Sequence, residues 1–301
     1  MPFPPTSSQS LCATRSFGIK NMKLLLILLS LFFVACSQHQ QDTVAVAHND
    51  SKQSNEAKNQ NENVPAPSPA ITPTPELNIA FGKGLRIVPK DIKLENQKLR
   101  YKINVTYPQI EGTKNLRILN LNHRMKRLVS EQYRWLLNPT KEDLRYFQKH
   151  PDIFNSVNLT YEVPLAMDDL LSIYFEGYIY GIGAAHSAQI SFSVNYDLRS
   201  GKLLKLADMF KPNINYLQVI SQYCSNDLAK QHSANKLFFT EDLAPKAKNY
   251  KSWNITREGI KINFDACSVL ACSEGQQSVT IPFAEMKDML NPNSAIILYA
   301  K

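Results

Sequence analysis

Hydrophobic and polar residues alternate along four stretches of this chain. Apolar side chains recur at every second position over residues 99–107, 157–163, 171–179 and 190–196. A period of two is typical of strands that bury one face and expose the other. The last three stretches follow one another closely, so we expect neighbouring antiparallel strands with a polar outer face.

A different period appears between and after these stretches. Residues 115–137 and 214–232 place apolar side chains three and four positions apart, which predicts helices with one buried face. Further strands are expected near residues 259–264 and 278–283, with a short helix at 284–290. Because strands and helices are segregated, we predict an α+β fold of antiparallel sheets packed with a few helices.

The first predicted helix also carries a row of arginines beside its apolar face. They are Arg117, Arg124, Arg127 and Arg134. This row is either a contact surface for an anionic polymer or an ordinary solvated helix face.

The N-terminal region has the pattern of a bacterial lipoprotein signal. Lys23 precedes an apolar run that ends in Val34-Ala35 before Cys36, and the run is short for a membrane span. We expect Met22 to be the true start, residues 1–35 to be removed, and Cys36 to carry the lipid anchor. The alternative is an ordinary secretory signal in which Cys36 is incidental. Ser37 favours an outer membrane in an organism that has one.

Residues 36–78 are polar and end in a proline-rich segment. Such a segment has too few large apolar side chains to form a core, so we predict a disordered tether. The folded part then begins near Ile79. It carries 29 basic and 21 acidic residues. Outside the cytoplasm, a cationic domain meets lipid headgroups and wall polymers, and nucleic acid is not an expected partner.

Cysteine spacing predicts one disulfide. Cys267 and Cys272 lie between two expected strands and could close a small loop, whereas Cys224 falls on the apolar face of the helix at 214–232. A bond between Cys224 and one of the other two cysteines stays open as the alternative.

The loop from Gly181 to Ser187, between two expected strands, is the main candidate for ligand binding. Gly181 and Gly183 permit close approach of a partner, and His186 and Ser187 offer polar contacts. The bland alternative is a wide hairpin turn with a capping histidine. The chain has no metal-ligand spacing and no nucleotide motif, so we expect no cofactor, no metal and no catalytic residue. A cell-wall hydrolase or transferase using Asp168, Asp169 and His186 is the competing hypothesis.

Several segments together resemble the extracytoplasmic region of the RsiV family, whose two domains also accompany the PdaC deacetylases. The matching segments are Tyr107–Gly112, Gly181–His186, Asn195–Lys202, Leu206–Phe210, Gly259–Phe264 and Val279–Phe283. The resemblance implies a small PdaC-type α+β domain over residues 79–150 and an RsiV-type domain over 151–301. It also implies a non-catalytic sensing module that recognises lysozyme or a peptidoglycan-associated ligand. Ser187 stands where the family more often has proline.

Charge bears on the choice between these two ligands. Many lysozymes are cationic, and a cationic domain repels them over the Debye length. An acidic patch, for instance Asp168, Asp169 and Glu176, would have to override that repulsion. Peptidoglycan or another anionic envelope polymer therefore fits the net charge better.

Overall fold

The computed structural model describes residues 79–82, 84–232 and 240–299. The expected signal, the lipidation site Cys36 and the tether lie outside these residues. In the part of the chain that is described, no helix is both long enough and apolar enough to span a bilayer.

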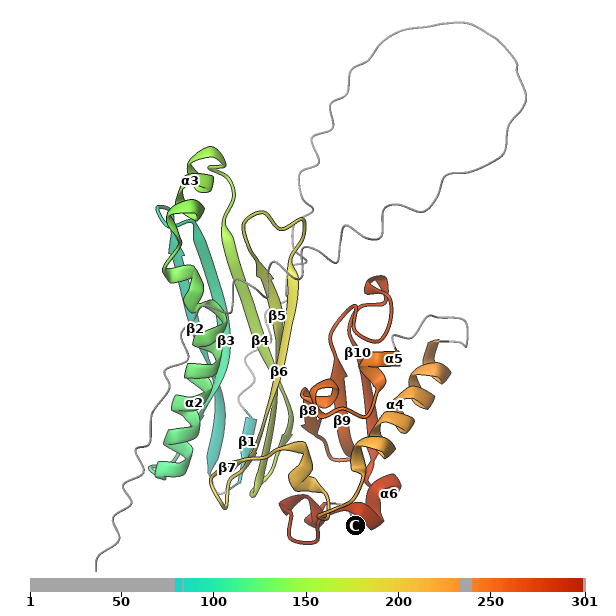
Figure 1. Ribbon diagram of the computed structural model, residues 1–301. Helices are drawn as coiled ribbons and strands as arrows, with labels where there is room; N and C mark the ends of the chain where they lie inside the picture. The colour runs from blue at the N-terminus through green and yellow to red at the C-terminus, as the bar shows by residue number, and fades with distance from the viewer. Residues whose placement is uncertain (1–78, 83, 233–239, 300–301) are drawn as a thin grey trace, which may run out of the picture. The chain divides into compact units, whose positions relative to one another are not determined.

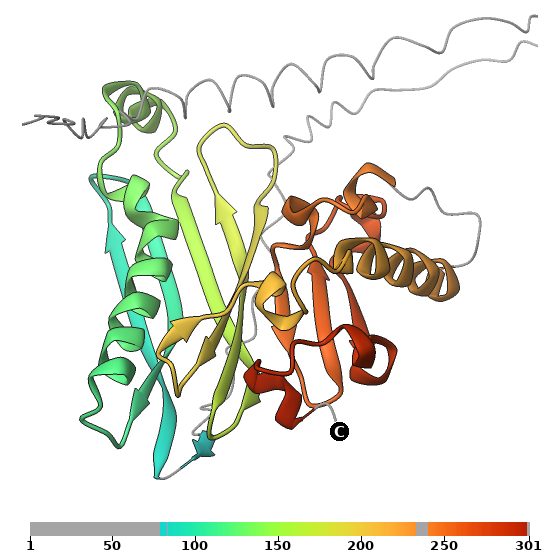
Figure 2. The same ribbon diagram turned by 60° about the horizontal axis from the view of Figure 1, so that its bottom comes forward.

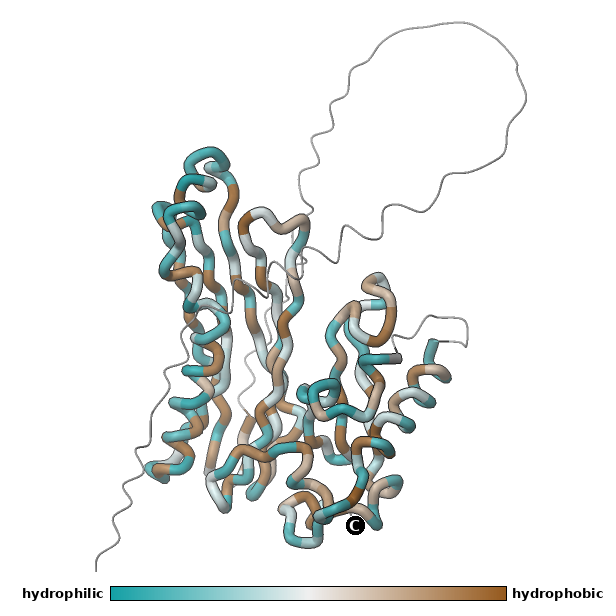
Figure 3. Tube along the Cα trace, in the orientation of Figure 1, coloured by the Kyte–Doolittle hydropathy of each residue, from teal (hydrophilic) through white to brown (hydrophobic). Residues whose placement is uncertain are grey.

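One seven-stranded sheet forms the first half of the fold (Figure 1). Its strands follow the order of the chain from one edge to the other: β1 (Ile79–Phe81), β2 (Leu85–Asn96), β3 (Tyr101–Glu111), β4 (Asn155–Ala166), β5 (Leu170–Tyr180), β6 (Ala188–Asp197) and β7 (Lys202–Leu203). The alternation predicted for β4, β5 and β6 is visible as alternating hydropathy along these strands (Figure 3).

The sheet is mixed rather than antiparallel throughout. Every neighbouring pair is antiparallel except β3 and β4, which run parallel from Tyr101 opposite Asn155 to Val105 opposite Leu159. A parallel pair needs a crossover connection. Here the crossover contains α2 (Leu116–Tyr133), the 3₁₀ turn η2 (Arg134–Leu137) and α3 (Lys141–Lys149). The predicted α+β class is confirmed, and this parallel pair is the one departure of the seven-stranded sheet from the expected antiparallel pairing.

Helix α2 covers one face of this sheet (Figures 1 and 2). Its buried side chains are Ile118, Leu121, Met125, Val129 and Tyr133, and they share a core with the apolar positions of β3 to β6. Asn115 caps the helix by accepting a hydrogen bond from the Arg117 amide at 2.9 Å. The helix predicted over residues 115–137 is thus present as α2 and η2.

The second half of the fold is built around a three-stranded sheet. Its strands, in the order β10-β9-β8, are β8 (Trp253–Ile255), β9 (Gly259–Phe264) and β10 (Gln277–Pro282). The helices are α4 (Tyr216–His232), α5 (Thr240–Leu243) and α6 (Phe283–Met286), with short 3₁₀ turns at 206–209, 247–250, 272–274, 287–289 and 295–298. Their apolar side chains form a second core.

Strand β8 packs on the polar face of β5 and β6 through buried amides and hydroxyls. Ser172 on β5 donates to Asn195 on β6 at 2.7 Å, and the Asn195 amide donates to the Trp253 carbonyl at 2.7 Å. Asn254, fully buried, donates to Ser172 at 2.8 Å and accepts from Asn263 at 2.9 Å. This network joins the two cores through satisfied polar contacts.

The division expected between residues 150 and 151 falls between β3 and β4, which are neighbours in one sheet. The side chains of α2 and of β3 to β6 share one core. Leu165 at the end of β4 and Leu170 at the start of β5 already belong to the second core, and the chain enters that core fully after β7.

Candidate functional site

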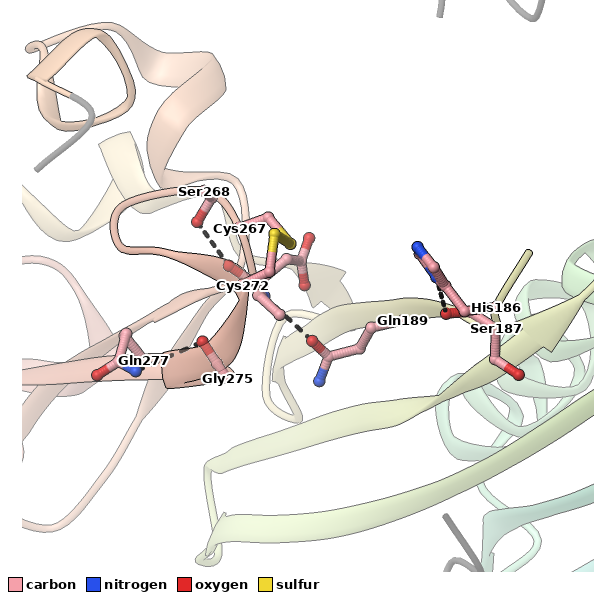
Figure 4. Close-up of a disulfide and its surroundings, with 10 residues drawn as sticks. His186, Ser187, Gln189, Cys267, Ser268, Cys272, Gly275 and Gln277 are labelled. Carbon is pink, nitrogen blue, oxygen red and sulfur yellow. Dashed lines mark hydrogen bonds between the residues drawn. A yellow bond between two sulfur atoms is a disulfide. The ribbon is translucent and has the colours of Figure 1, made fainter. Parts of the chain in front are cut away.

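The loop at residues 181–187 connects β5 to β6, as the sequence predicts. β1 pairs with the first residues of β2, whereas Tyr180 lies opposite Ser156 at the start of β4, so the loop is at the end of the sheet away from β1. Gly183 has a φ of +78°, in the left-handed region that favours glycine, and is exposed. The exposed His186 ring lies 3.1 Å, through Nδ1, from the carbonyl oxygen of Ser187 (Figure 4).

An exposed tryptophan stands beside the base of this loop. Trp135 is 43% exposed, and a Cβ placed on Gly181 would lie 3.7 Å from its Cη2 atom. The indole is held by its Nε1, which donates to the Gln132 carbonyl at 3.0 Å. The buried Asn155 accepts from the Ile182 amide at 2.8 Å and fixes the loop. Tryptophan is enriched at protein interfaces, so this exposed ring beside the loop is a candidate contact for a partner. The alternation of the strands gave no hint of Trp135.

The disulfide lies near the same end of β6 (Figure 4). Cys267 and Cys272 are bonded, which is the pairing the sequence favoured. Gln189, near the start of β6, accepts from the Ala266 amide at 3.1 Å and donates to Gln276 at 3.1 Å. The structure therefore brings the loop containing His186 and the disulfide loop to one region, linked through Gln189.

Cys224 is the free cysteine of the described residues, and it is buried on α4. Burial raises the pKa of its thiol to about 12. The side chain therefore stays protonated at neutral pH and serves as core packing, as its position on the apolar helix face predicted.

Asp168 and Asp169 lie far from His186. The two aspartates occupy the turn that precedes β5, whereas His186 follows its other end. An eleven-residue strand separates them, which at the rise of a β-strand is roughly 35 Å. Asp169 instead lies 3.7 Å from Arg199. The structure therefore does not bring Asp168, Asp169 and His186 together, and the two aspartates form no acidic patch beside the loop.

Glu176 occupies the polar face of β5. Burial, reinforced by the nearby charge of Glu162, raises the pKa of its carboxyl, and Lys261 acts in the opposite direction. Burial also raises the pKa of Tyr174 on the same face, and the nearby carboxylates of Glu176 and Glu162 raise it further. In the described part of the chain, no group of three His, Cys, Asp or Glu side chains is placed to hold a metal ion.

A groove lies on the polar face of β2, β3 and β4. Its volume is about 940 Å³. Most of the lining residues are polar or charged, and they come from three strands: Lys90, Asp91, Lys93, Glu95, Lys102, Asn104, Thr106, Asn158 and Thr160, with Pro89, Leu94, Ile103 and Leu159. Hydroxyls and amides can both donate and accept hydrogen bonds, and the charges have both signs.

Ion pairs within the groove are weak and exposed. Lys93 lies 3.6 Å from Asp91, and Lys102 lies 3.6 Å from Glu95. Exposed pairs of this kind contribute about 0–1 kcal/mol, so a ligand can displace them at small cost. This site could not be predicted from the sequence, because β2, which supplies most of its charges, has no clear strand pattern.

Family comparisons match two successive parts of the chain. The model described as "Deacetylase PdaC" matches residues 93–189, and the model described as "Protein of unknown function (DUF3298)" matches residues 207–284. A curated relative is the peptidoglycan-N-acetylmuramic acid deacetylase PdaC of Bacillus subtilis strain 168. It is 28% identical over 199 residues, which is 65% of this chain and 40% of the relative. The chain thus spans less than half of that relative's length.

Solved structures share the fold. A DUF3298 family member from Bacteroides fragilis superposes with a TM-score of 0.51 at 14% identity, over 72% of this chain and 96% of that one. A DUF3298 family protein from Pseudomonas aeruginosa gives a TM-score of 0.47 at 18% identity, over 69% and 94% of the two chains. At these identities, the first likeness establishes the architecture alone.

Proposed function

Since the chain carries a PdaC domain followed by a DUF3298 domain, we propose that it is a non-catalytic binding module of the bacterial cell envelope with a peptidoglycan-associated ligand. The proposal includes a lipid anchor at Cys36, which places the module outside the cytoplasm. The curated relative is named for an activity on peptidoglycan. That name supports a wall-associated ligand for the part of the relative that this chain matches.

The polar groove on β2, β3 and β4 is the observation that carries this proposal. Glycan strands present hydroxyl and acetamido groups, which match the Asn104, Thr106 and Asn158 side chains of the lining. Lys93 and Lys102 would meet the carboxylates that peptidoglycan carries, whereas Lys90 is paired with Glu111 at 3.1 Å. Polar groups that converge in a concave surface fix the orientation of a bound ligand and give specificity.

Two observations favour binding over catalysis. The groups of the competing hydrolase hypothesis are separated by the length of β5. The groove itself contains no histidine or cysteine, and each of its two carboxylates lies within 3.6 Å of a lysine. This arrangement suits recognition of polar groups more than acid–base chemistry, which needs carboxyl groups of contrasting pKa.

A sedimentation assay with insoluble peptidoglycan tests the groove. We expect the full chain carrying Cys36→Ala to sediment with the polymer, and we expect Asn104→Ala/Asn158→Ala to reduce the bound fraction at least fivefold. Asn226→Ala, at an exposed site on α4, is the matched control and should bind normally. Equal binding by the groove variant and the control would refute the groove as the site.

A lysozyme-like protein is the second candidate ligand. The exposed loop 181–187 with Trp135 beside it is the surface that favours this candidate. Calorimetric titration of the same Cys36→Ala chain with a c-type lysozyme at physiological salt distinguishes the two. Saturable one-to-one binding that Trp135→Ala weakens at least tenfold would support the lysozyme reading. Absence of heat and of a complex would remove it for this class of lysozyme.

A further inference from the structure

Positive charge is concentrated in one segment of the folded chain. Residues 112–141 contain seven basic side chains and only one acidic side chain, Glu131. The whole of residues 79–301 has a net charge of +8, from 29 basic and 21 acidic residues. Most of the net charge of the folded part therefore lies in and around α2.

The basic side chains of α2 point away from the sheet, toward solvent. Its apolar side chains face the sheet, and Arg117, Arg124, Lys126, Arg127 and Arg134 are all exposed. From Arg117 to Arg134 the row extends roughly 25 Å along the helix and its 3₁₀ continuation. We call these five side chains the α2 basic row. The polar side chains Asp91, Lys93, Asn104, Thr106 and Asn158 of the groove alternate with core positions of their strands, so they lie on the face opposite to the one that α2 covers.

The row is unusually rich in arginine. Residues 79–301 contain 20 lysines and nine arginines. Four of those arginines belong to the α2 basic row, but only one of the lysines does. Solubility needs charge of either kind, whereas a planar guanidinium matches phosphate oxygens with two parallel hydrogen bonds. The bias toward arginine favours recognition of phosphate groups.

Internal partners leave most of the row available. Arg127 lies 3.9 Å from Glu131 across one helical turn, an exposed pair of small energy. Arg117 donates to the Arg199 carbonyl. Among the described residues, no acidic side chain lies within ion-pair distance of Arg124, Lys126 or Arg134.

The apolar side chains of the outer face decide between a polymer and a bilayer. Leu116 and Leu119 are exposed at the beginning of α2, and Trp135 is exposed just after its end. No large apolar side chain is exposed between them on the described helix. A helix that lies in a membrane interface needs a continuous apolar face toward the acyl chains, and here that face is inside the core.

We propose that the α2 basic row binds a linear phosphate-bearing polymer of the cell envelope. The row is a second contact surface, on the face of the sheet opposite to the groove, and it operates whether or not the groove binds glycan. Bound phosphates replace the counterions of the arginines, so affinity should fall steeply with salt.

Binding of inorganic polyphosphate to the full chain carrying Cys36→Ala tests the proposal. The test variant is Arg124→Gln/Arg127→Gln/Arg134→Gln, which keeps good helix formers at exposed positions. The control is Lys230→Gln/Lys248→Gln/Lys251→Gln, which removes the same charge from exposed sites in the other half. We expect the arginine variant to raise the Kd at least tenfold and the lysine control to change it less than threefold.

A third variant, with lysine at the same three arginine positions, keeps the charge and removes the guanidinium. We expect it to weaken polyphosphate binding by about threefold to fivefold. Circular dichroism confirms that each variant is folded. Equal losses in the arginine variant and the lysine control would overturn the proposal, since diffuse charge would then explain the binding. Binding to phosphatidylglycerol vesicles without binding to polyphosphate would also overturn it, in favour of a membrane surface.

Discussion

At the scale of single residues, Asn254 is the side chain on which the junction of the two cores most depends. It is fully buried, donates to Ser172 and to the Ile173 carbonyl at 2.8 and 3.1 Å, and accepts from Asn263 and Ser193 at 2.9 and 3.1 Å. A buried polar group that loses its partner costs about 1–3 kcal/mol. Removing Asn254 would leave several such groups unpaired at once.

We therefore expect Asn254→Ala to lower the free energy of unfolding by about 3 kcal/mol. Urea denaturation followed by circular dichroism measures this change. Asn226→Ala, the same substitution at an exposed site, should change stability by less than about 0.5 kcal/mol. A small effect at Asn254 would mean that water replaces the network.

Glu176 should make stability depend on pH. Its folded pKa is raised above the ordinary value of 4.5, chiefly by burial. The folded protein therefore holds a proton that the unfolded chain releases, and the stabilising effect is complete below about pH 4.5 and is lost as the pH rises through the folded pKa. We expect Glu176→Gln to stabilise the protein at pH 7 relative to wild type, and the difference to shrink at pH 4. Urea titrations at the two pH values would contradict this if the difference were constant.

At the scale of elements, Gly177 on β5 and Gly181 in the loop after it differ in how much space a side chain would have. A Cβ on Gly177 would lie 2.0 Å from the Asn158 carbonyl oxygen of the neighbouring strand. Because this oxygen belongs to the backbone, the clash could be relieved only if one of the two strands moved. A Cβ on Gly181 would meet only Trp135, at an ordinary 3.7 Å. The close approach of β4 and β5 thus requires glycine at one position and merely tolerates it at the other.

The matched pair Gly177→Ala and Gly181→Ala measures this difference. We expect Gly177→Ala to lower the free energy of unfolding by at least about 2 kcal/mol and thereby to lower the melting temperature strongly. We expect Gly181→Ala to leave the melting temperature nearly unchanged. Thermal unfolding of both variants, side by side, provides the test. Equal melting temperatures would show that β4 and β5 separate easily at this point.

Elements with strong local patterns could be predicted from the sequence, and those with mixed patterns could not. The period of two in β4, β5 and β6 and the period of 3.6 in α2 and α4 come from one-sided burial, which a sequence records directly. β2 was missed because it carries Pro89 and five charged side chains, and Ile87 is its one buried residue, so it lacks a regular alternation of apolar and polar positions. The strand predicted over residues 99–107 was expected to end before Pro108, but β3 continues to Glu111. Pro89 and Pro108 lie opposite each other, where their missing N–H groups cost little.

At the scale of the whole molecule, the two cores should unfold together. The polar network of Ser172, Asn195 and Asn254 is buried between them, so neither half can open without exposing unpaired groups. We expect one calorimetric transition in which the van't Hoff and calorimetric enthalpies agree for the folded part. Two separate transitions would show that the junction is weaker than either core.

The disulfide should stabilise the second half without being needed for its fold. Its ring spans residues 267–272, and closing a loop of this size contributes about 2 kcal/mol by the chain-entropy relation. We expect Cys267→Ser/Cys272→Ser to lower the free energy of unfolding by that amount. A reducing agent should lower the stability of the wild type and leave the double variant unchanged. An equal response of both proteins to the reductant would point to another thiol.

The candidate sites show where inference from sequence ends. The loop at 181–187 could be predicted because glycines and a histidine interrupt two clear strands. The groove could not be predicted, because it forms only where β2, β3 and β4 lie side by side. The parallel strands β3 and β4 are far apart in the sequence. The arginines of the α2 basic row could be recognised in the sequence. That they have few acidic partners could be seen only from the positions of the surrounding strands.

The parallel pair of β3 and β4 also determines how the sheet can be completed as the chain emerges N-terminus first. β1, β2 and β3 can pair with one another as soon as residue 111 is free. The outer edge of β3 then has no partner until residues 155–159 arrive, after both crossover helices. An open strand edge is a template for pairing with other chains. During the interval between these two moments, this strand edge is open to pairing with a second copy of the protein.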